Sequence, residues 1–195
     1  MPGENPPHDP NRPGHVAGIG RLLIYEAGFL TGAANGVAND PWQAGGHCLA
    51  AIVLAAAAVE AQVGEWVALP ANRDKYKDDA PRWRAQSGRT HEVIKAIIRK
   101  EGGGDVGSMP WYGRMRCLFA LRSHLLHYFP EPRLVGTFPE RLEDCIRQGH
   151  LVPAGDDAMD WTSRLLTPSV ASQAASIAHE AIDGFAAAVG VDGAV

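Results

Sequence analysis

The chain has 195 residues, of which 46% are hydrophobic and 21% charged, and this is enough for one well-buried domain. Its net charge of -4 and pI near 6.0 exclude a generally basic chain, so contact with RNA would require a local basic patch. The longest apolar run, Cys48 to Val59, has 12 residues, well short of the roughly 20 that a membrane helix needs. We therefore expect no membrane segment.

The N-terminal stretch differs in composition from the rest. Residues 1 to 15 contain five prolines and little that can be buried, so we predict a disordered arm there and a single helical domain over residues 16 to 190. Three cysteines, Cys48, Cys117 and Cys145, are widely spaced and form no CxxC pair. This pattern indicates buried free thiols in a reducing cytoplasm.

Two long helices are predicted in the first part of the chain. From about residue 18 to residue 39, apolar residues recur at helical spacing around Leu22 and form a face expected to be core. Glu26 falls about 40° from the centre of that face, because a helix advances about 100° per residue. After a break that includes the Gly45 to Gly46 pair, a second helix extends to about Ala68, with Glu60 on the flank of its apolar side. Glu26 is thus the first candidate partner for a buried cation, and Glu60 is the alternative.

Residues 69 to 90 change character and combine charged with aromatic side chains. The candidates for RNA contact in this segment are Lys75, Tyr76, Lys77, Arg82 and Arg84. Aromatic residues flanked by bases can stack on a single-stranded nucleic acid. A solvated connector is the alternative interpretation, because charge runs usually cover a surface.

Further helices are predicted along the rest of the chain. A short helix over residues 90 to 101 ends at three glycines, and another is expected from about residue 140 to residue 148. Thr167 is a natural N-cap, with Pro168 in the first turn of a final helix that extends to about Val189. The fold class predicted is all-α, an antiparallel bundle of four to five main helices.

A central amphipathic helix begins at Pro110 and stops before Pro130, because proline removes a backbone donor and restricts the preceding residue. Arg122 projects from the middle of its apolar face, where a guanidinium requires an anionic partner. His127 projects from the opposite face, roughly 140° away, together with Arg116, Ser123 and His124. One straight helix therefore does not bring Arg122 and His127 to one atom, and a second copy of the chain is one solution.

The run LRSHLLHY over residues 121 to 128 resembles the L-R-N-x-L-V-H-Y signature of HEPN-like domains. These are all-α modules whose hallmark is an arginine followed, four to six residues later, by a histidine. In active members this pair cuts RNA without a metal at a dimer interface. The resemblance implies that Arg122 contacts phosphate and that His127 is the catalytic histidine. Ser123 stands where asparagine is usual, which changes the local geometry and leaves the pair intact.

Other residues near this motif have simpler expected roles. Tyr128 is expected to pack against the core, and Arg116 is a further candidate for RNA contact on the face of His127. His124 and His127 have a spacing that suits two metal ligands, but no HExxH or ExxH pattern supplies the others. We therefore expect neither a metal nor another cofactor.

These patterns lead to one hypothesis and one alternative. The hypothesis is a metal-independent endoribonuclease of the toxin or phage-defence kind, active as a homodimer, with RNA as substrate. A toxin of this kind would act with an antitoxin or another partner protein, which the sequence does not identify. The alternative is a non-catalytic helical interaction module, in which Arg122 forms a buried ion pair.

Overall fold

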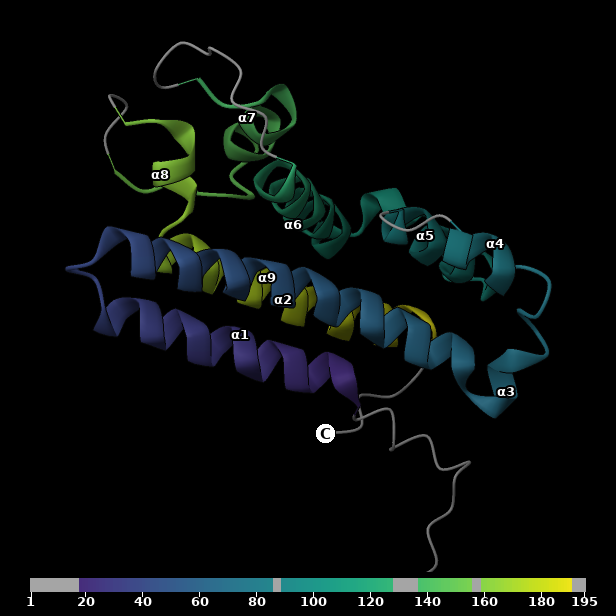
Figure 1. The fold of residues 1–195 in the computed structure, drawn as a ribbon. Helices are drawn as coiled ribbons and strands as arrows, with labels where there is room; N and C mark the ends of the chain where they lie inside the picture. The colour runs from purple at the N-terminus through teal and green to yellow at the C-terminus, as the bar shows by residue number, and fades with distance from the viewer. Residues whose placement is uncertain (1–17, 86–88, 128–136, 156–158, 191–195) are drawn as a thin grey trace, which may run out of the picture.

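The computed structural model describes residues 18–85, 89–127, 137–155 and 159–190 (Figure 1). Throughout these ranges the regular structure is helical. The elements are α1 (Ile19–Gly36), α2 (Pro41–Ala68), α3 (Pro70–Arg73), α4 (Ala80–Ala85), α5 (Thr90–Lys100), the 3-10 turn η2 (Val106–Ser108), α6 (Pro110–Leu126), α7 (Glu140–Arg147), α8 (Trp161–Leu165) and α9 (Pro168–Ala188). The all-α prediction is confirmed, while the predicted arm over residues 1 to 15 lies outside the described residues.

Capping side chains fix the starts of the two longest helices. The Asp40 carboxylate accepts hydrogen bonds from the backbone N–H groups of Trp42 and Gln43, both at 3.1 Å, and so satisfies donors that a helix leaves open at its N-terminus. Thr167 caps α9 in the same way, as predicted, through the N–H of Val170. The Gly45 to Gly46 pair lies inside α2 rather than before it, because the cap at Asp40 nucleates the helix upstream of the glycines.

Helix α2 lies at the centre of the bundle, with α1, α9 and α6 as its main neighbours. Its buried side is rich in alanine, which allows close approach of these helices. By length and composition α2 is apolar enough to cross a membrane, although the sequence expectation was no membrane segment. In the fold its apolar side supplies much of a single core that includes residues from α1 to α9.

The bundle is not uniformly antiparallel. Helices α1 and α2 form an antiparallel hairpin, whereas α9 lies beside α2 and runs in the same direction (Figure 1). Trp66 near the end of α2 accordingly meets Phe185 near the end of α9, with ring centroids 5.6 Å apart. The connections between these parallel helices pass through α3 to α8.

The orientation of α1 contradicts the sequence prediction. Its buried residues are Gly20, Ile24, Ala27 and Ala34, which lie on the side opposite Leu22. Small residues at these positions let α1 approach α2 closely; a Cβ at Gly20 would lie 3.0 Å from the carbonyl oxygen of Ala58. The predicted core face around Leu22 is therefore exposed to solvent.

The prediction of three free thiols is also wrong. Cys117 of α6 and Cys145 of α7 form a disulfide, with their Cα atoms 5.7 Å apart. Only the packing of α7 against α6 brings these two residues together, and a spacing of 28 residues gave no indication of it. Cys48 is the free cysteine of the described residues, and burial raises the pKa of its thiol. The basis for expecting a reducing cytoplasm is thereby removed.

Candidate functional site

Arg122 and Glu60 form an ion pair between α6 and α2. Arg122 Nη1 lies 2.8 Å from Glu60 Oε2, and the two side chains are 17% and 32% exposed. The guanidinium also lies over the ring of Phe119, 5.4 Å from its centroid. Thr90 Oγ1, at the start of α5, donates to the other carboxylate oxygen of Glu60 at 3.2 Å. Both charges are thus held in place at a junction of three helices.

Glu26 does not take part in this pair. The sequence favours Glu26 over Glu60 because Glu26 falls within an apolar face, whereas Glu60 is on the flank of one. That face is exposed, and Glu26 with it, so its carboxylate is hydrated and needs no buried partner. Glu60, the alternative predicted from the flank of α2, is the residue that meets Arg122.

His127 lies at the C-terminal end of α6. It is the C-cap residue, and its backbone N–H donates to the carbonyl of Ser123 at 3.0 Å. His127 and Ser123 are exposed, whereas His124 is half-buried and has a contact of its own. Arg122 points toward α2 while His127 is on the exposed side of α6. Tyr128, the last residue of the motif, lies outside the described residues.

A cluster of basic residues gathers beside α6. Exposed arginines come from three elements: Arg89 from the N-cap of α5, Arg116 from α6 and Arg141 from α7. Burial lowers the pKa of His91, and the charges of these three arginines lower it further, against the opposing effect of Glu92. The charges of these three arginines thus act on one imidazole, and Arg89, Arg116 and Arg141 together are called the basic patch below.

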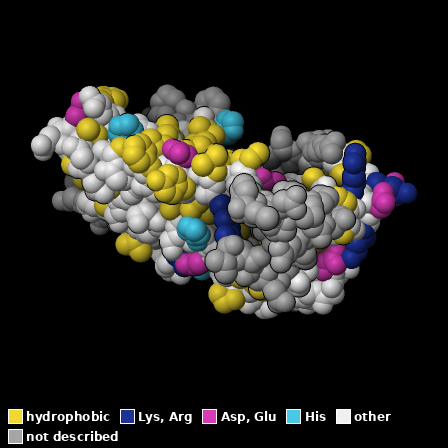
Figure 2. All heavy atoms as spheres, turned by 90° about the horizontal axis from the view of Figure 1, so that it is seen from below, with side chains coloured by type: hydrophobic (Ala, Val, Ile, Leu, Met, Phe, Trp, Pro, Cys, Tyr) yellow, Lys and Arg dark blue, Asp and Glu magenta, His cyan; other side chains and the backbone are white. Residues whose placement is uncertain are grey.

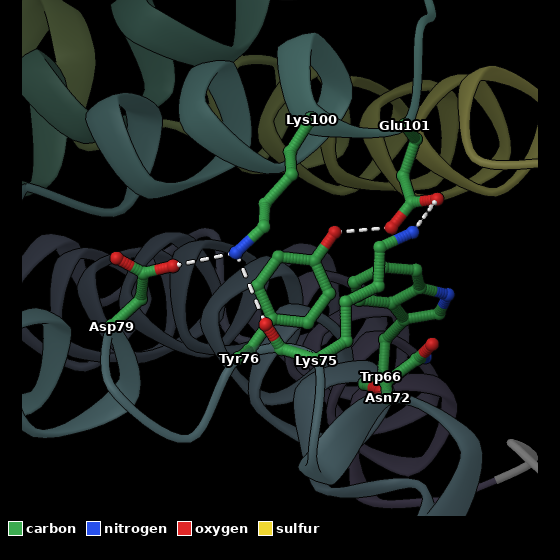
Figure 3. A network of polar contacts seen from close by, with 7 residues as sticks. All are labelled: Trp66, Asn72, Lys75, Tyr76, Asp79, Lys100 and Glu101. Atoms are coloured by element: carbon green, nitrogen blue, oxygen red, sulfur yellow. Dashed lines mark hydrogen bonds and ion pairs between the residues drawn. The ribbon is translucent and has the colours of Figure 1, made fainter.

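The predicted RNA contact through Tyr76 is wrong, because this side chain is 0% exposed. Its hydroxyl donates to Glu101, and Lys75 Nζ donates to the same carboxylate at 2.6 Å (Figure 3). Lys100 Nζ lies 4.8 Å from the centroid of the Tyr76 ring and is 3.0 Å from Asp79. This network joins the segment over residues 69 to 90, called the connector, to the end of α5. It leaves no face of the Tyr76 ring on which a base can stack.

A pocket of about 610 Å³ lies between the connector and α2. Glu60 and Thr90 form part of its wall, next to the ion pair with Arg122. Lys77, one of the predicted RNA contacts, lines it together with Arg73 and Trp83. The side chains of Arg82 and Arg84 lie outside the described residues. Of the predicted contacts in this segment with described side chains, Lys77 is therefore the one that lines the same pocket as Glu60.

Some residues of this region were missed by sequence reasoning. Arg89, His91 and Arg141 come together only through the packing of α5 and α7 on α6. Nothing in the sequence around any one of them indicates the other two. Thr90 was identified as a helix start, not as a donor to Glu60. In the part of the chain that the structure describes, no three His, Cys, Asp or Glu side chains come together as a metal site.

Comparisons with known proteins give no relative. No family model, curated protein or solved structure matches the chain.

Proposed function

We propose that the protein is a metal-independent endoribonuclease whose site lies at the C-terminal half of α6. The observation that carries this proposal is the placement of Arg122 and His127 in the last turns of one helix, with the guanidinium anchored by Glu60. The basic patch of Arg89, Arg116 and Arg141 adjoins the same helix and suits an RNA backbone. The resemblance of residues 121 to 128 to HEPN-like domains supports the same chemistry.

In the proposed reaction, His127 accepts the proton of a ribose 2'-hydroxyl, whose oxygen then attacks the adjacent phosphorus. The bond from phosphorus to the 5'-oxygen breaks, that oxygen takes up a proton from water, and His127 returns its proton to water. Arg122 neutralises charge on the phosphate in the transition state. The products are a 2',3'-cyclic phosphate and a 5'-hydroxyl, with no redox step and no metal.

The position of Arg122 places one condition on this mechanism. Glu60 holds one of its nitrogens, and a guanidinium has five N–H donors, so others remain for a phosphate. Because Arg122 points toward α2 while His127 is exposed, we propose that a second copy of the chain at the end of α6 completes the site. Mixing inactive Arg122→Lys and His127→Ala chains should then restore activity in mixed dimers.

The test of the proposal is cleavage of single-stranded RNA by the purified protein in EDTA. His127→Ala should abolish cleavage, and His179→Ala, which removes an exposed histidine from α9, should leave it unchanged. Mass spectrometry of the products should show 2',3'-cyclic ends. Equal activity of wild type and His127→Ala would refute the assignment.

A second function, a non-catalytic interaction module, is favoured by one observation. The charge of Arg122 is already balanced by Glu60, so the ion pair has a structural role without any ligand. In this case the wild type cleaves no RNA, and Arg122→Met with Glu60→Leu retains all binding of its partner.

A further inference from the structure

Helix α1 presents a row of large apolar side chains to solvent. Leu22 is 58% exposed, Tyr25 71% and Phe29 66%, and Ile19 flanks them. These are the residues whose periodicity predicted a core face. Figure 2 looks at the molecule from the side of α1 and shows hydrophobic side chains gathered on this face. Within the described part of one copy, a helix face with the composition of a core is thus left uncovered.

Glycines continue the row toward the end of α1. Gly32 and Gly36 follow Phe29, so that Leu22, Tyr25, Phe29, Gly32 and Gly36 are spaced by three and four residues alternately. This is the spacing of the seam along which two helices pack. A Cβ added at either glycine would meet nothing within 4 Å. Contacts within the described part of the chain therefore do not require glycine at these two positions.

We propose that this face of α1, called the α1 seam, is the interface of a symmetric dimer with a second copy of the chain. An interface about a two-fold axis must be complementary to itself. The α1 seam meets that condition because its first half carries large side chains and its second half carries none. Two antiparallel α1 helices with Phe29 at the axis place Leu22 of each opposite Gly36 of the other.

The area of the α1 seam suits a stable dimer. The exposed parts of Ile19, Leu22, Tyr25 and Phe29 amount to about 600 Å² at the usual size of such side chains, and the backbone at Gly32 and Gly36 adds to this. A standard interface buries about 800 Å² on each partner. The area is thus of the right order without any rearrangement of the fold.

The charges of α1 favour a second copy over a membrane surface. The helix has two charged residues, Arg21 and Glu26, one of each sign. A helix that lies on a membrane typically carries several Lys and Arg on its polar side. Glu26 lies at the edge of the α1 seam, where it stays hydrated in a dimer.

The first test is sedimentation of the full chain. Phe29→Glu should halve the mass of the assembly, or raise its dissociation constant at least about tenfold, with the circular dichroism spectrum unchanged. Ala96→Glu, on the exposed side of α5, adds the same charge and should leave the assembly intact. A monomeric wild type, or an assembly that Phe29→Glu does not affect, would overturn the proposal.

The second test separates specific packing from general stickiness. Gly32→Leu makes the α1 seam more apolar but fills the recess that the partner needs, so we expect weaker association and an intact monomer. Stronger association, or tighter binding to vesicles of phosphatidylcholine and phosphatidylglycerol, would mean that the α1 seam is not a helix-pairing surface.

The direction of pairing is tested with Leu22→Cys. In the antiparallel arrangement the two copies of residue 22 lie about 21 Å apart, at 1.5 Å per residue, and do not form a disulfide. Rapid formation of a disulfide-linked dimer would show parallel pairing and overturn the antiparallel arrangement. Helix α6, which carries the proposed RNA site, does not pack against α1 and lies on the other side of α2 (Figure 1). The tests of the α1 seam can therefore succeed or fail independently of RNA cleavage.

Discussion

Arg122 of α6 and Glu60 of α2 meet with a nitrogen to oxygen distance of 2.8 Å, and neither charge has another residue of opposite sign at bonding distance among the described side chains. The pair is less exposed than a surface salt bridge and more exposed than a fully buried one. Its energy should therefore lie between those two cases.

We predict that Arg122→Met and Glu60→Leu each lower the free energy of unfolding by about 1 to 3 kcal/mol, because each leaves one charge without its partner. The double variant should recover much of this loss. Urea unfolding of the four proteins measures the coupling. Glu26→Leu is the control and should show no coupling with Arg122→Met; additive losses in the Glu60 cycle would contradict the pair.

The second prediction concerns the close approach of α6 and α9. A Cβ at Gly184 would overlap the indole of Trp111, so Gly184→Ala should lower the free energy of unfolding by about 1 to 3 kcal/mol. Gly64→Ala in α2, where a Cβ meets nothing within 4 Å, should instead raise it by about 0.5 to 1 kcal/mol. Thermal unfolding of both variants gives the comparison, and equal effects would contradict the contact.

The third prediction is a pH dependence that arises from Glu101. Burial alone would raise the pKa of this carboxyl, but hydrogen bonds from Lys75 and Tyr76 and the charges of Lys75 and Lys100 outweigh it, so the pKa of Glu101 is lowered. A lowered pKa contributes stability above the unfolded value of 4.5, and this contribution is lost as the pH falls through the folded value.

The measurement for Glu101 is the difference in unfolding free energy between wild type and Glu101→Gln. We expect this difference to be constant near neutral pH and to shrink as the pH falls below 4.5. Glu92→Gln, an exposed residue of α5, serves as the control for general acid effects. A difference that does not change with pH would contradict the network of Figure 3.

The fourth prediction concerns the disulfide of Cys117 and Cys145. Without reductant, alkylation of the unfolded chain should label one cysteine, and after reduction it should label three. Because the disulfide closes a loop of 28 residues, its reduction should lower the free energy of unfolding by about 3 to 4 kcal/mol. Cys48→Ser should leave this effect of the reductant unchanged, and labelling of three cysteines without reductant would refute the disulfide.

Most helices could be predicted from the sequence, but which helices pack against one another could not. Capping by Thr167 and the apolar spacing of α6 are local signals, so the prediction placed these helices correctly. The outward face of α1 could not be predicted, because periodicity identifies an apolar side without saying what covers it. Gly20 and Ala27 pack inward since small residues allow α1 and α2 to approach closely, and a hydrophobicity pattern gives such residues little weight.

The candidate site was predictable only in part. Arg122 requires an anion by its position, and one of the two carboxylates proposed was correct. The basic patch around His91 depends on three elements that are far apart in sequence, so no local pattern indicates it. Tyr76 looked like a base-stacking residue because its neighbours are charged, whereas those charges form the network that holds it in the core.

Glu60 belongs to two structures at once: its carboxylate pairs with Arg122, and the residue lines the pocket that Lys77 and Trp83 also line. A cationic or hydrogen-bond-donating molecule that reached the Glu60 carboxylate from that pocket would compete with Arg122 for its oxygens. By reciprocity, a phosphate that draws Arg122 away from Glu60 makes the pocket more favourable for such a molecule by the same factor. Titration of one ligand in the presence of the other would therefore reveal thermodynamic linkage between two sites that share a single side chain.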